Sequence, residues 1–168
     1  MTLLESDGKA ALISEYGDRW DMDVMVETGT AIGDLSLLCA PDFERIVTIE
    51  AADDYYRSAV NRLLRFDHVC VIHGDSAEWL GPVLAIIDTP SVVWLDAHEI
   101  ADDGHAALRA EMVALAHDPN QHVILIDDAR LCSGRKGWMT LAEIEEWAAA
   151  YGYSHEGVQD DVVRLVPR

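Results

Sequence analysis

The chain is 168 residues long, half of its residues are apolar, and its formal net charge is −19. This length and apolar content predict one folded domain with a substantial core and exclude a disordered chain. So negative a surface repels phosphate backbones and anionic lipid, which argues against nucleic acid and membranes as primary partners and favours a basic or neutral small molecule.

The cysteines and the lack of targeting segments indicate the cellular compartment. Cys39, Cys70 and Cys132 are widely spaced and form no C-x-x-C motif. An odd number of cysteines without a pairing pattern is typical of reduced thiols. The first residues lack the apolar core of a signal peptide, and no stretch is long and apolar enough to cross a membrane. We therefore expect a cytoplasmic protein.

Strand-like and helix-like segments alternate along the chain. Pro82 is expected to split or delay its helix, whereas Thr140 and Glu143 form a capping box that begins the last helix. This alternation predicts a parallel sheet covered on both faces. The predicted helices cover 1–20, a stretch from 35, 51–66, 76–87, 106–117 and 140–151, and the predicted strands cover 24–26, 45–50, 68–73, 91–96, 121–127, 153–156 and 162–166.

The segment 24–34 reads VMVETGTAIGD, a short apolar strand followed by a glycine turn and the start of a helix. Gly29 permits a sharp bend, and Gly33 permits close approach of a ligand to the start of the helix. Glu27 at the strand end disfavours pyrophosphate and favours a cationic or hydroxyl-bearing ligand. The spacing differs from that of dinucleotide-binding proteins and of the P-loop, so a nicotinamide dehydrogenase is the weaker alternative. A tight turn without a ligand is another.

Further side chains that can bind a ligand recur where predicted strands end. Glu27, Glu50, His73 and Asp96 follow one another at equal intervals, each interval one strand–helix unit long. In a parallel sheet such strand ends meet at one edge, where ligands bind at the switch point. Glu50 is placed to accept hydrogen bonds from both hydroxyls of a ribose. A solvated acid at a strand end is the alternative.

Three aspartates suggest a cation site. Asp96 ends one apolar strand, and Asp127 and Asp128 end the next. Two carboxylates about 4 Å apart repel by roughly 4 kcal/mol at an effective dielectric constant near 20, and a bound cation or a shared proton relieves that repulsion. Hard oxygen ligands suit Mg²⁺, Mn²⁺ or Ca²⁺, with His98 as a further ligand or a base. Alternatively, one aspartate caps the next loop and pairs with Arg130.

Taken in order, these motifs resemble those of class I S-adenosylmethionine-dependent methyltransferases across residues 24–130. The resemblance implies a Rossmann-like α/β fold, with a mostly parallel seven-stranded sheet whose last strand is antiparallel. It implies one domain, 1–168, with an N-terminal helix (1–20), cofactor and metal motifs (24–130) and a C-terminal helix and strand pair (138–168). Asp75 is expected to take the adenine amino group, with its neighbour along the ring. The cofactor-binding residues implied in this way are Glu27, Gly29, Thr30, Gly33, Glu50, Asp75 and Ser76.

The aspartate pattern is similar to that of the metal-dependent O-methyltransferases, both the catechol type and the sugar-modifying type. In those enzymes the metal chelates two substrate oxygens, and the ionised hydroxyl attacks the sulfonium methyl in line. The resemblance implies Mg²⁺ or Mn²⁺ held by Asp96, Asp127 and Asp128, and a small-molecule hydroxyl as acceptor. Asp96 and His98 are the expected catalytic residues.

Two departures from that pattern leave alternatives open. Catechol-type enzymes have a lysine base three residues after the first metal aspartate, where this chain has Glu99, so His98 or the more distant Lys136 is the candidate base. Only about twenty residues precede the first motif. The acceptor pocket is therefore open, completed by a partner subunit of a homo-oligomer, or lost. A module that binds S-adenosylmethionine or S-adenosylhomocysteine without methyl transfer is the alternative function.

Overall fold

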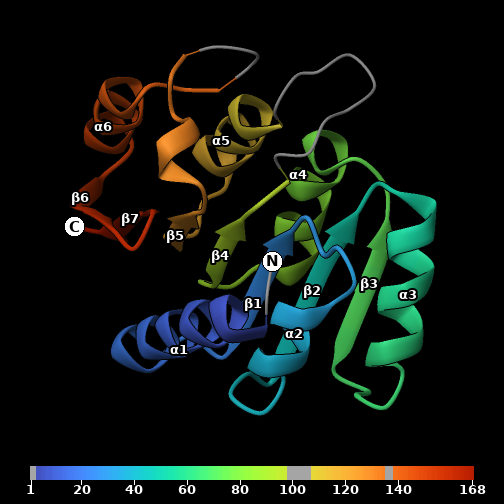
Figure 1. The fold of residues 1–168 in the computed structure, drawn as a ribbon. Coiled ribbons are helices and arrows are strands. Elements are labelled where there is room, and N and C mark those ends of the chain that lie inside the picture. Colours follow the sequence, from blue (N-terminus) through green and yellow to red (C-terminus); the bar gives the residue numbers. More distant parts are fainter. Residues whose placement is uncertain (1–2, 98–106, 135–137) are drawn as a thin grey trace.

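The computed structural model of the chain describes residues 3–97, 107–134 and 138–168. Within these ranges, strands and helices alternate as far as β5, and two strands follow the last helix (Figure 1). The helices are α1 (Leu3–Trp20), α2 (Asp34–Cys39), α3 (Asp53–Leu63), α4 (Ser76–Ile87), α5 (Leu108–His117) and α6 (Leu141–Ala150), with a short 3₁₀ helix at Ala129–Leu131. The strands are β1 (Val24–Thr28), β2 (Arg45–Glu50), β3 (Val69–His73), β4 (Val92–Leu95), β5 (Val123–Ile126), β6 (Tyr153–Gln159) and β7 (Val162–Pro167).

The seven strands form one sheet in the order β3-β2-β1-β4-β5-β7-β6. Strands β1 to β5 pair in parallel, whereas β7 is antiparallel to both of its neighbours. The chain first moves outward through β2 and β3 and then returns to place β4 beside β1. The direction of the connections therefore reverses between β1 and β4, which is the switch point of the sheet. The predicted α/β fold, with its antiparallel last strand, is confirmed.

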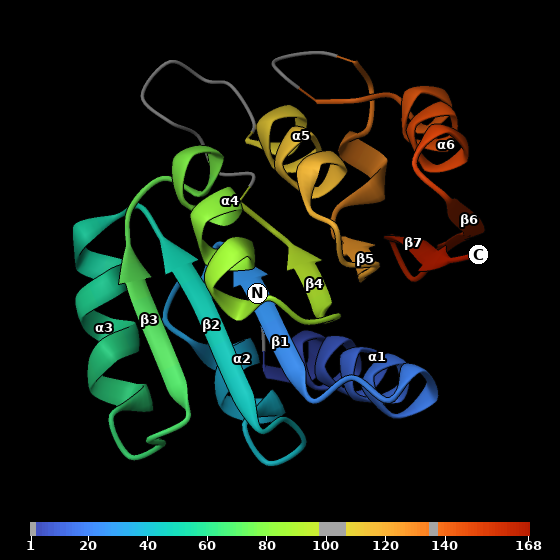
Figure 2. The same ribbon diagram turned by 180° about the vertical axis from the view of Figure 1, so that it is seen from behind.

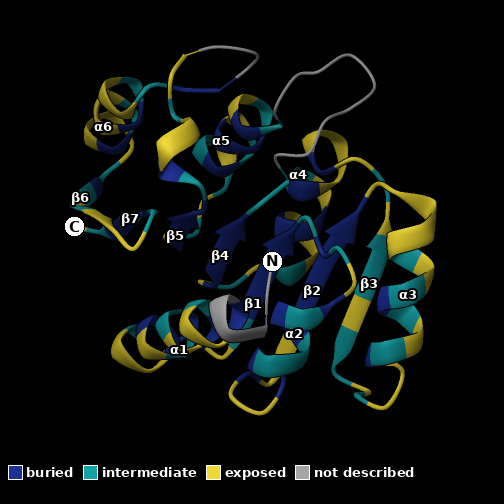
Figure 3. Ribbon diagram, in the orientation of Figure 1, coloured by how far each residue is buried: buried dark blue, intermediate teal, exposed yellow. Residues whose placement is uncertain are grey.

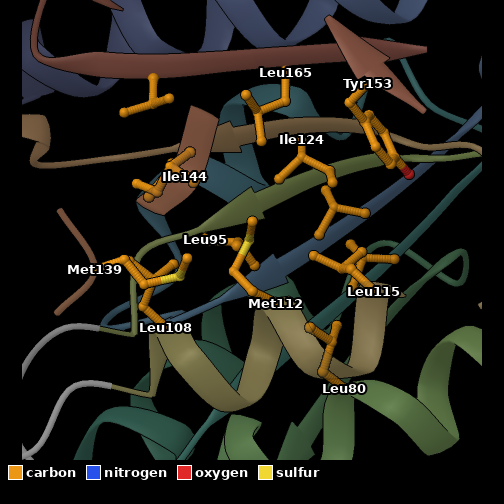
Figure 4. Packing of buried hydrophobic residues seen from close by; sticks show 14 of the residues in the cluster. Leu80, Leu95, Leu108, Met112, Leu115, Ile124, Met139, Ile144, Tyr153 and Leu165 are labelled. Carbon is orange, nitrogen blue, oxygen red and sulfur yellow. The ribbon is translucent and has the colours of Figure 1, made fainter. Parts of the chain in front are cut away.

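Each face of the sheet has its own apolar core, because successive side chains of a strand point to opposite faces. Helices α4, α5 and α6 cover one face, and α1 and α2 cover the other (Figures 1 and 2). Trp94 and Leu95 of β4 divide between the two cores in this way. Figure 4 shows Met112 of α5 packed close to Leu95 and Ile124 of the sheet.

Strands β4 and β5 are buried along their whole length and β1 is buried except at Val24, whereas the edge strand β3 is only partly buried (Figure 3). A strand covered on both faces needs apolar residues on both, and this is why 92–95 and 123–126 are unbroken apolar runs. None of the helices in the described ranges combines the length and hydropathy of a bilayer-crossing segment.

The elements predicted from the sequence are present, with small shifts at their ends. The capping box of α6 is confirmed, because Thr140 Oγ1 accepts from Glu143 N at 3.1 Å and Glu143 Oε2 accepts from Thr140 N at 2.7 Å. The prediction that Pro82 splits or delays α4 is wrong, since α4 is continuous through Pro82. Pro82 and Glu78 are both exposed, so water can solvate the Glu78 carbonyl that loses its partner within the helix.

Candidate functional site

The carboxyl ends of β2, β1, β4 and β5 lie side by side at one edge of the sheet (Figure 1). Glu50 is the last residue of β2, Glu27 precedes the end of β1, and Asp96 and Asp127 directly follow β4 and β5. Three of these side chains are buried, and Asp96 is partly exposed. The predicted gathering of acids at one edge is therefore confirmed.

The turn after β1 passes directly over the end of β4. Gly29 has a φ of 80°, and a Cβ atom there would overlap the backbone carbonyl of Asp96. Gly29 N donates to the Ile49 carbonyl at 2.9 Å, and Asp96 N donates to the Thr28 carbonyl at 3.1 Å. Both the backbone conformation and the close approach require glycine at this position. Gly29 thereby joins three strands at the switch point.

Glu50 holds the same turn from the neighbouring strand. Its Oε2 accepts a hydrogen bond from Ala31 N at 2.8 Å, and its Oε1 accepts one from Ala52 N at 2.7 Å. Ala31 has a φ of 48°, which is uncommon for a residue with a Cβ atom. Each carboxylate oxygen can accept more than one hydrogen bond. Glu50 therefore keeps acceptor capacity for two adjacent hydroxyls, which is what a ribose requires.

Glu27 lies almost completely buried beneath the turn. Its Oε2 accepts hydrogen bonds from Ser36 Oγ and, at 2.7 Å, from Thr48 Oγ1. Burial raises the pKa of Glu27 to about 7, with the Glu50 charge adding to the rise and the two hydroxyls opposing it. Glu27 thus links β1 to α2 and β2, and it supports the turn from within.

Two other predicted cofactor residues also have internal contacts. Thr30 Oγ1 shares a hydrogen bond of 2.5 Å with Thr48 Oγ1. Gly33 has a φ of 81°, and a Cβ atom there would lie 3.2 Å from Leu63 and 3.4 Å from Ala59 of α3. Gly33 therefore serves the backbone conformation and the packing against α3. Contact of Thr30 and Gly33 with a cofactor stays a prediction.

Asp75 lies at the carboxyl end of β3, one strand outward from Glu50. It is the N-cap residue of α4, where its Oδ1 accepts from Ala77 N at 2.9 Å, and its side chain is exposed. The following residue, Ser76, is buried. Neighbouring positions for Asp75 and Glu50 suit the neighbouring adenine and ribose of a nucleoside.

From the sequence, Glu111 could face the site or lie on a solvated face of its helix; in the structure it is fully buried on α5. Among the described residues, neither of its carboxylate oxygens has a hydrogen-bond partner of normal geometry. Burial raises the pKa of Glu111 to about 7, although the nearby Ser76 and Thr28 hydroxyls oppose that rise. The only signal in the sequence is a glutamate in the first turn of an otherwise apolar helix. That signal also fits a solvated residue.

Asp96 and Asp127 interact directly at the ends of β4 and β5, as predicted. Burial is the main cause that raises the pKa of Asp96 to about 8, and the charge of Asp127 and a side-chain hydrogen bond with it add to the effect. Lys9 Nζ of α1 forms an ion pair with Asp127 Oδ2. No pattern in the sequence pointed to this lysine, which lies far from Asp127 in the chain.

Asp128 does not join the other two aspartates in a common ligand set. Its backbone is in the left-handed region, with a φ of 54°, and its Oδ1 pairs with Arg130 Nη1 at 2.6 Å. This is the alternative considered from the sequence, in which one aspartate begins the next loop and pairs with Arg130. Within the described ranges, no group of three or more His, Cys, Asp or Glu side chains is arranged to hold a metal ion. The residues present therefore do not fit the predicted three-aspartate metal centre.

The two candidate bases, His98 and Lys136, both lie outside the described residues, as does Glu99. Their roles stay predictions. Asp96 and Ala97, after the end of β4, are the last residues described before His98.

Comparison with known proteins identifies the fold. No protein-family model and no curated protein matches the sequence. Among solved structures, an O-methyltransferase from Bacillus cereus in complex with S-adenosylhomocysteine superposes with a TM-score of 0.71 at 19% identity, over 96% of this chain and 81% of the other. The O-methyltransferase TomG from Streptomyces achromogenes, in complex with S-adenosylmethionine, gives a TM-score of 0.71 at 19% identity, over 96% and 80%. The chain therefore has the fold of the class I O-methyltransferases.

Proposed function

We propose that this chain binds S-adenosylmethionine at the carboxyl edge of its sheet and transfers the methyl group to a hydroxyl of a small molecule. The observation that carries the proposal is the arrangement of Glu50, whose two oxygens hold the Gly29–Gly33 turn beside the switch point. Solved structures of the same fold with S-adenosylmethionine or S-adenosylhomocysteine bound support the choice of cofactor.

The cofactor would lie across the ends of β1, β2 and β3. In this proposal Glu50 accepts hydrogen bonds from the ribose hydroxyls, and Asp75 accepts one from the adenine amino group, with Ser76 alongside the ring. The turn at Gly29, supported by Glu27 and Thr30, holds the methionine part. This direction brings the sulfonium to the switch point between β1 and β4, next to Asp96.

Methyl transfer would be a direct displacement. The acceptor oxygen forms a bond to the methyl carbon as the bond from that carbon to sulfur breaks, and S-adenosylhomocysteine leaves as a neutral thioether. The acceptor hydroxyl must give up its proton, and Asp96 and His98 are the groups proposed to take part in that step. Holding donor and acceptor in line supplies much of the rate acceleration in such a reaction.

The net charge of the chain supports the proposal of a small-molecule acceptor. The net charge of −19 disfavours phosphate-rich substrates. The two solved structures compared above are both O-methyltransferases, which supports oxygen as the acceptor atom. No step of the proposed reaction passes through the predicted metal ion, because the described aspartates do not form a fitting ligand set.

Isothermal titration calorimetry with S-adenosylhomocysteine tests the proposal. We expect binding with one site per chain, and we expect Glu50→Gln to weaken it at least tenfold because a neutral amide accepts less well from two hydroxyls. Glu44→Gln is the matched control, since Glu44 is an exposed acid that precedes β2, and it should bind as the wild type does.

Binding of NAD in place of S-adenosylhomocysteine, or equal affinity in the Glu50→Gln variant, would contradict the proposal. Tight binding without turnover on any hydroxylated acceptor would instead favour the alternative of a cofactor-binding module.

A further inference from the structure

We propose that Lys9 is the resident cation of the Asp96–Asp127 pair, so that its ammonium group takes the position expected for a divalent metal ion. Lys9 Nζ forms an ion pair with Asp127 Oδ2, and the Asp127 side chain is only 2% exposed. A carboxylate removed from water to this degree needs a compensating positive charge. Lys9 supplies that charge from within the chain.

The packing of α1 directs Lys9 to this place. Ile13 and Tyr16 follow Lys9 at spacings that put all three on one side of the helix, and both are buried in the core between α1 and the sheet. The Lys9 ammonium lies 5.7 Å from the centre of the Trp94 ring, and Trp94 is fully buried in that core. Lys9 is therefore held between the helix and the sheet, with 21% of its side chain exposed.

The partners of Asp127 and Asp128 explain why a lysine suits the position better than a metal ion. Asp127 Oδ1 accepts from Asp128 N at 2.8 Å while its Oδ2 binds Lys9. The Asp128 carboxylate pairs with Arg130. Mg²⁺ requires a near-octahedral set of oxygen ligands, and a divalent ion beside Asp127 would also be repelled by the ammonium.

A fixed ammonium has a consequence for the reaction, and this part rests on the proposed function. The positive charge lies beside Asp96, where the acceptor oxygen would gain negative charge as it loses its proton. Because Asp127 balances the Lys9 charge, Lys9 would act by holding Asp127, and Asp127 would hold Asp96 through their side-chain hydrogen bond, without the uptake of a metal ion. Lys9 would thereby act as a positioning residue through Asp127.

Binding of Mn²⁺, followed by electron paramagnetic resonance on the full chain after treatment with EDTA, tests the proposal without any acceptor. We expect wild type and Asp127→Asn to bind Mn²⁺ equally weakly, through surface acids alone. We expect Lys9→Met to gain one site at least tenfold tighter than any site of the wild type. Adding Asp127→Asn to Lys9→Met should remove that site, and Lys9→Arg, which keeps the charge, should not create it.

A stoichiometric Mn²⁺ site in the wild type that Asp127→Asn removes would overturn the proposal. So would a Lys9→Met variant that is folded and gains no site. If Lys9→Met does not fold, the comparison of wild type with Asp127→Asn still decides between the two cations. Binding of S-adenosylhomocysteine, measured on the same samples, reports separately on the proposed function.

Discussion

At the scale of single residues, Glu111 is the side chain least explained by the proposed reaction. It is fully buried, and within the described part of the chain its two oxygens lack hydrogen-bond partners of normal geometry. Its neighbours include Ser76 and Thr28, which lie at the start of α4 and the end of β1. A protonated Glu111 avoids a buried charge at this point beneath the candidate cofactor site.

The raised pKa of Glu111 predicts a stability that depends on pH. Burial raises the pKa to about 7 in the folded chain, so the folded state binds more protons than the unfolded state at pH values between the ordinary pKa of a glutamate and this raised pKa. The associated stability is present at about pH 4 and is lost as the pH rises through the raised pKa. The change in the free energy of unfolding caused by Glu111→Gln should therefore depend on pH. It should be more favourable at pH 8.5 than at pH 4.5, by about 2–3 kcal/mol.

Urea unfolding at the two pH values measures this difference. Glu146→Gln, at an exposed position of α6, is the control and should show almost no pH-dependent change. An equal effect of Glu111→Gln at both pH values would mean that folding does not raise the pKa of Glu111.

Residue identity alone predicted some site features and missed others. The meeting of Glu27, Glu50, Asp96 and Asp127 was predictable because each lies at the end of an apolar strand, and such parallel strands end at one edge of the sheet. The internal contacts of Thr30 and Gly33 were not predictable, because they depend on Thr48 and on α3, which pack there only in the folded chain. Asp128 was assigned to the metal centre, although its left-handed backbone turns it toward Arg130.

At the scale of elements, α1 shows how a helix at one end of the chain takes part in the site. Lys9 pairs with Asp127, and further along the helix Tyr16 Oη and Arg19 both donate to Glu156 of β6, at 2.6 Å for the tyrosine. The sequence predicted a helix at 1–20 but gave no partner for its polar residues. Contacts between segments this far apart in the chain leave no local pattern in the sequence, so they could not be predicted from it.

Helix α4 contains a proline at a position where a helix normally loses stability. Pro82 lies in the interior of α4 and is exposed. Pro82→Ala should restore one backbone hydrogen bond and remove the clash with the preceding turn, which raises the free energy of unfolding by about 1–3 kcal/mol. Chemical denaturation measures the change, with Pro90→Ala in the loop before β4 as control.

The loop proline should behave in the opposite way. Pro90 is exposed and outside any helix, so its replacement adds freedom to the unfolded chain and gives a neutral or slightly lower stability. A destabilised Pro82→Ala variant would mean that packing contacts of the proline ring contribute more to the free energy of unfolding than the missing hydrogen bond would.

At the scale of the whole molecule, the order of the strands explains why acids far apart in the sequence meet. Glu27, Glu50, Asp96 and Asp127 come from four separate strand–helix units, and the parallel order β2-β1-β4-β5 puts all four at one edge. The sequence predicted this architecture because alternating strands and helices restrict the topology. It offered the pairing of an aspartate with Arg130 only as an alternative, and it could not predict which carboxylates would pair with a lysine or a hydroxyl.

A crystal structure of the chain with S-adenosylhomocysteine bound tests the proposed cofactor site most directly. We expect the ribose hydroxyls within hydrogen-bond distance of the Glu50 carboxylate, the adenine beside Asp75, and the sulfur pointing toward Asp96 at the switch point. A nucleoside bound away from the ends of β1 and β2, or one that leaves Glu50 without contact, would contradict this placement.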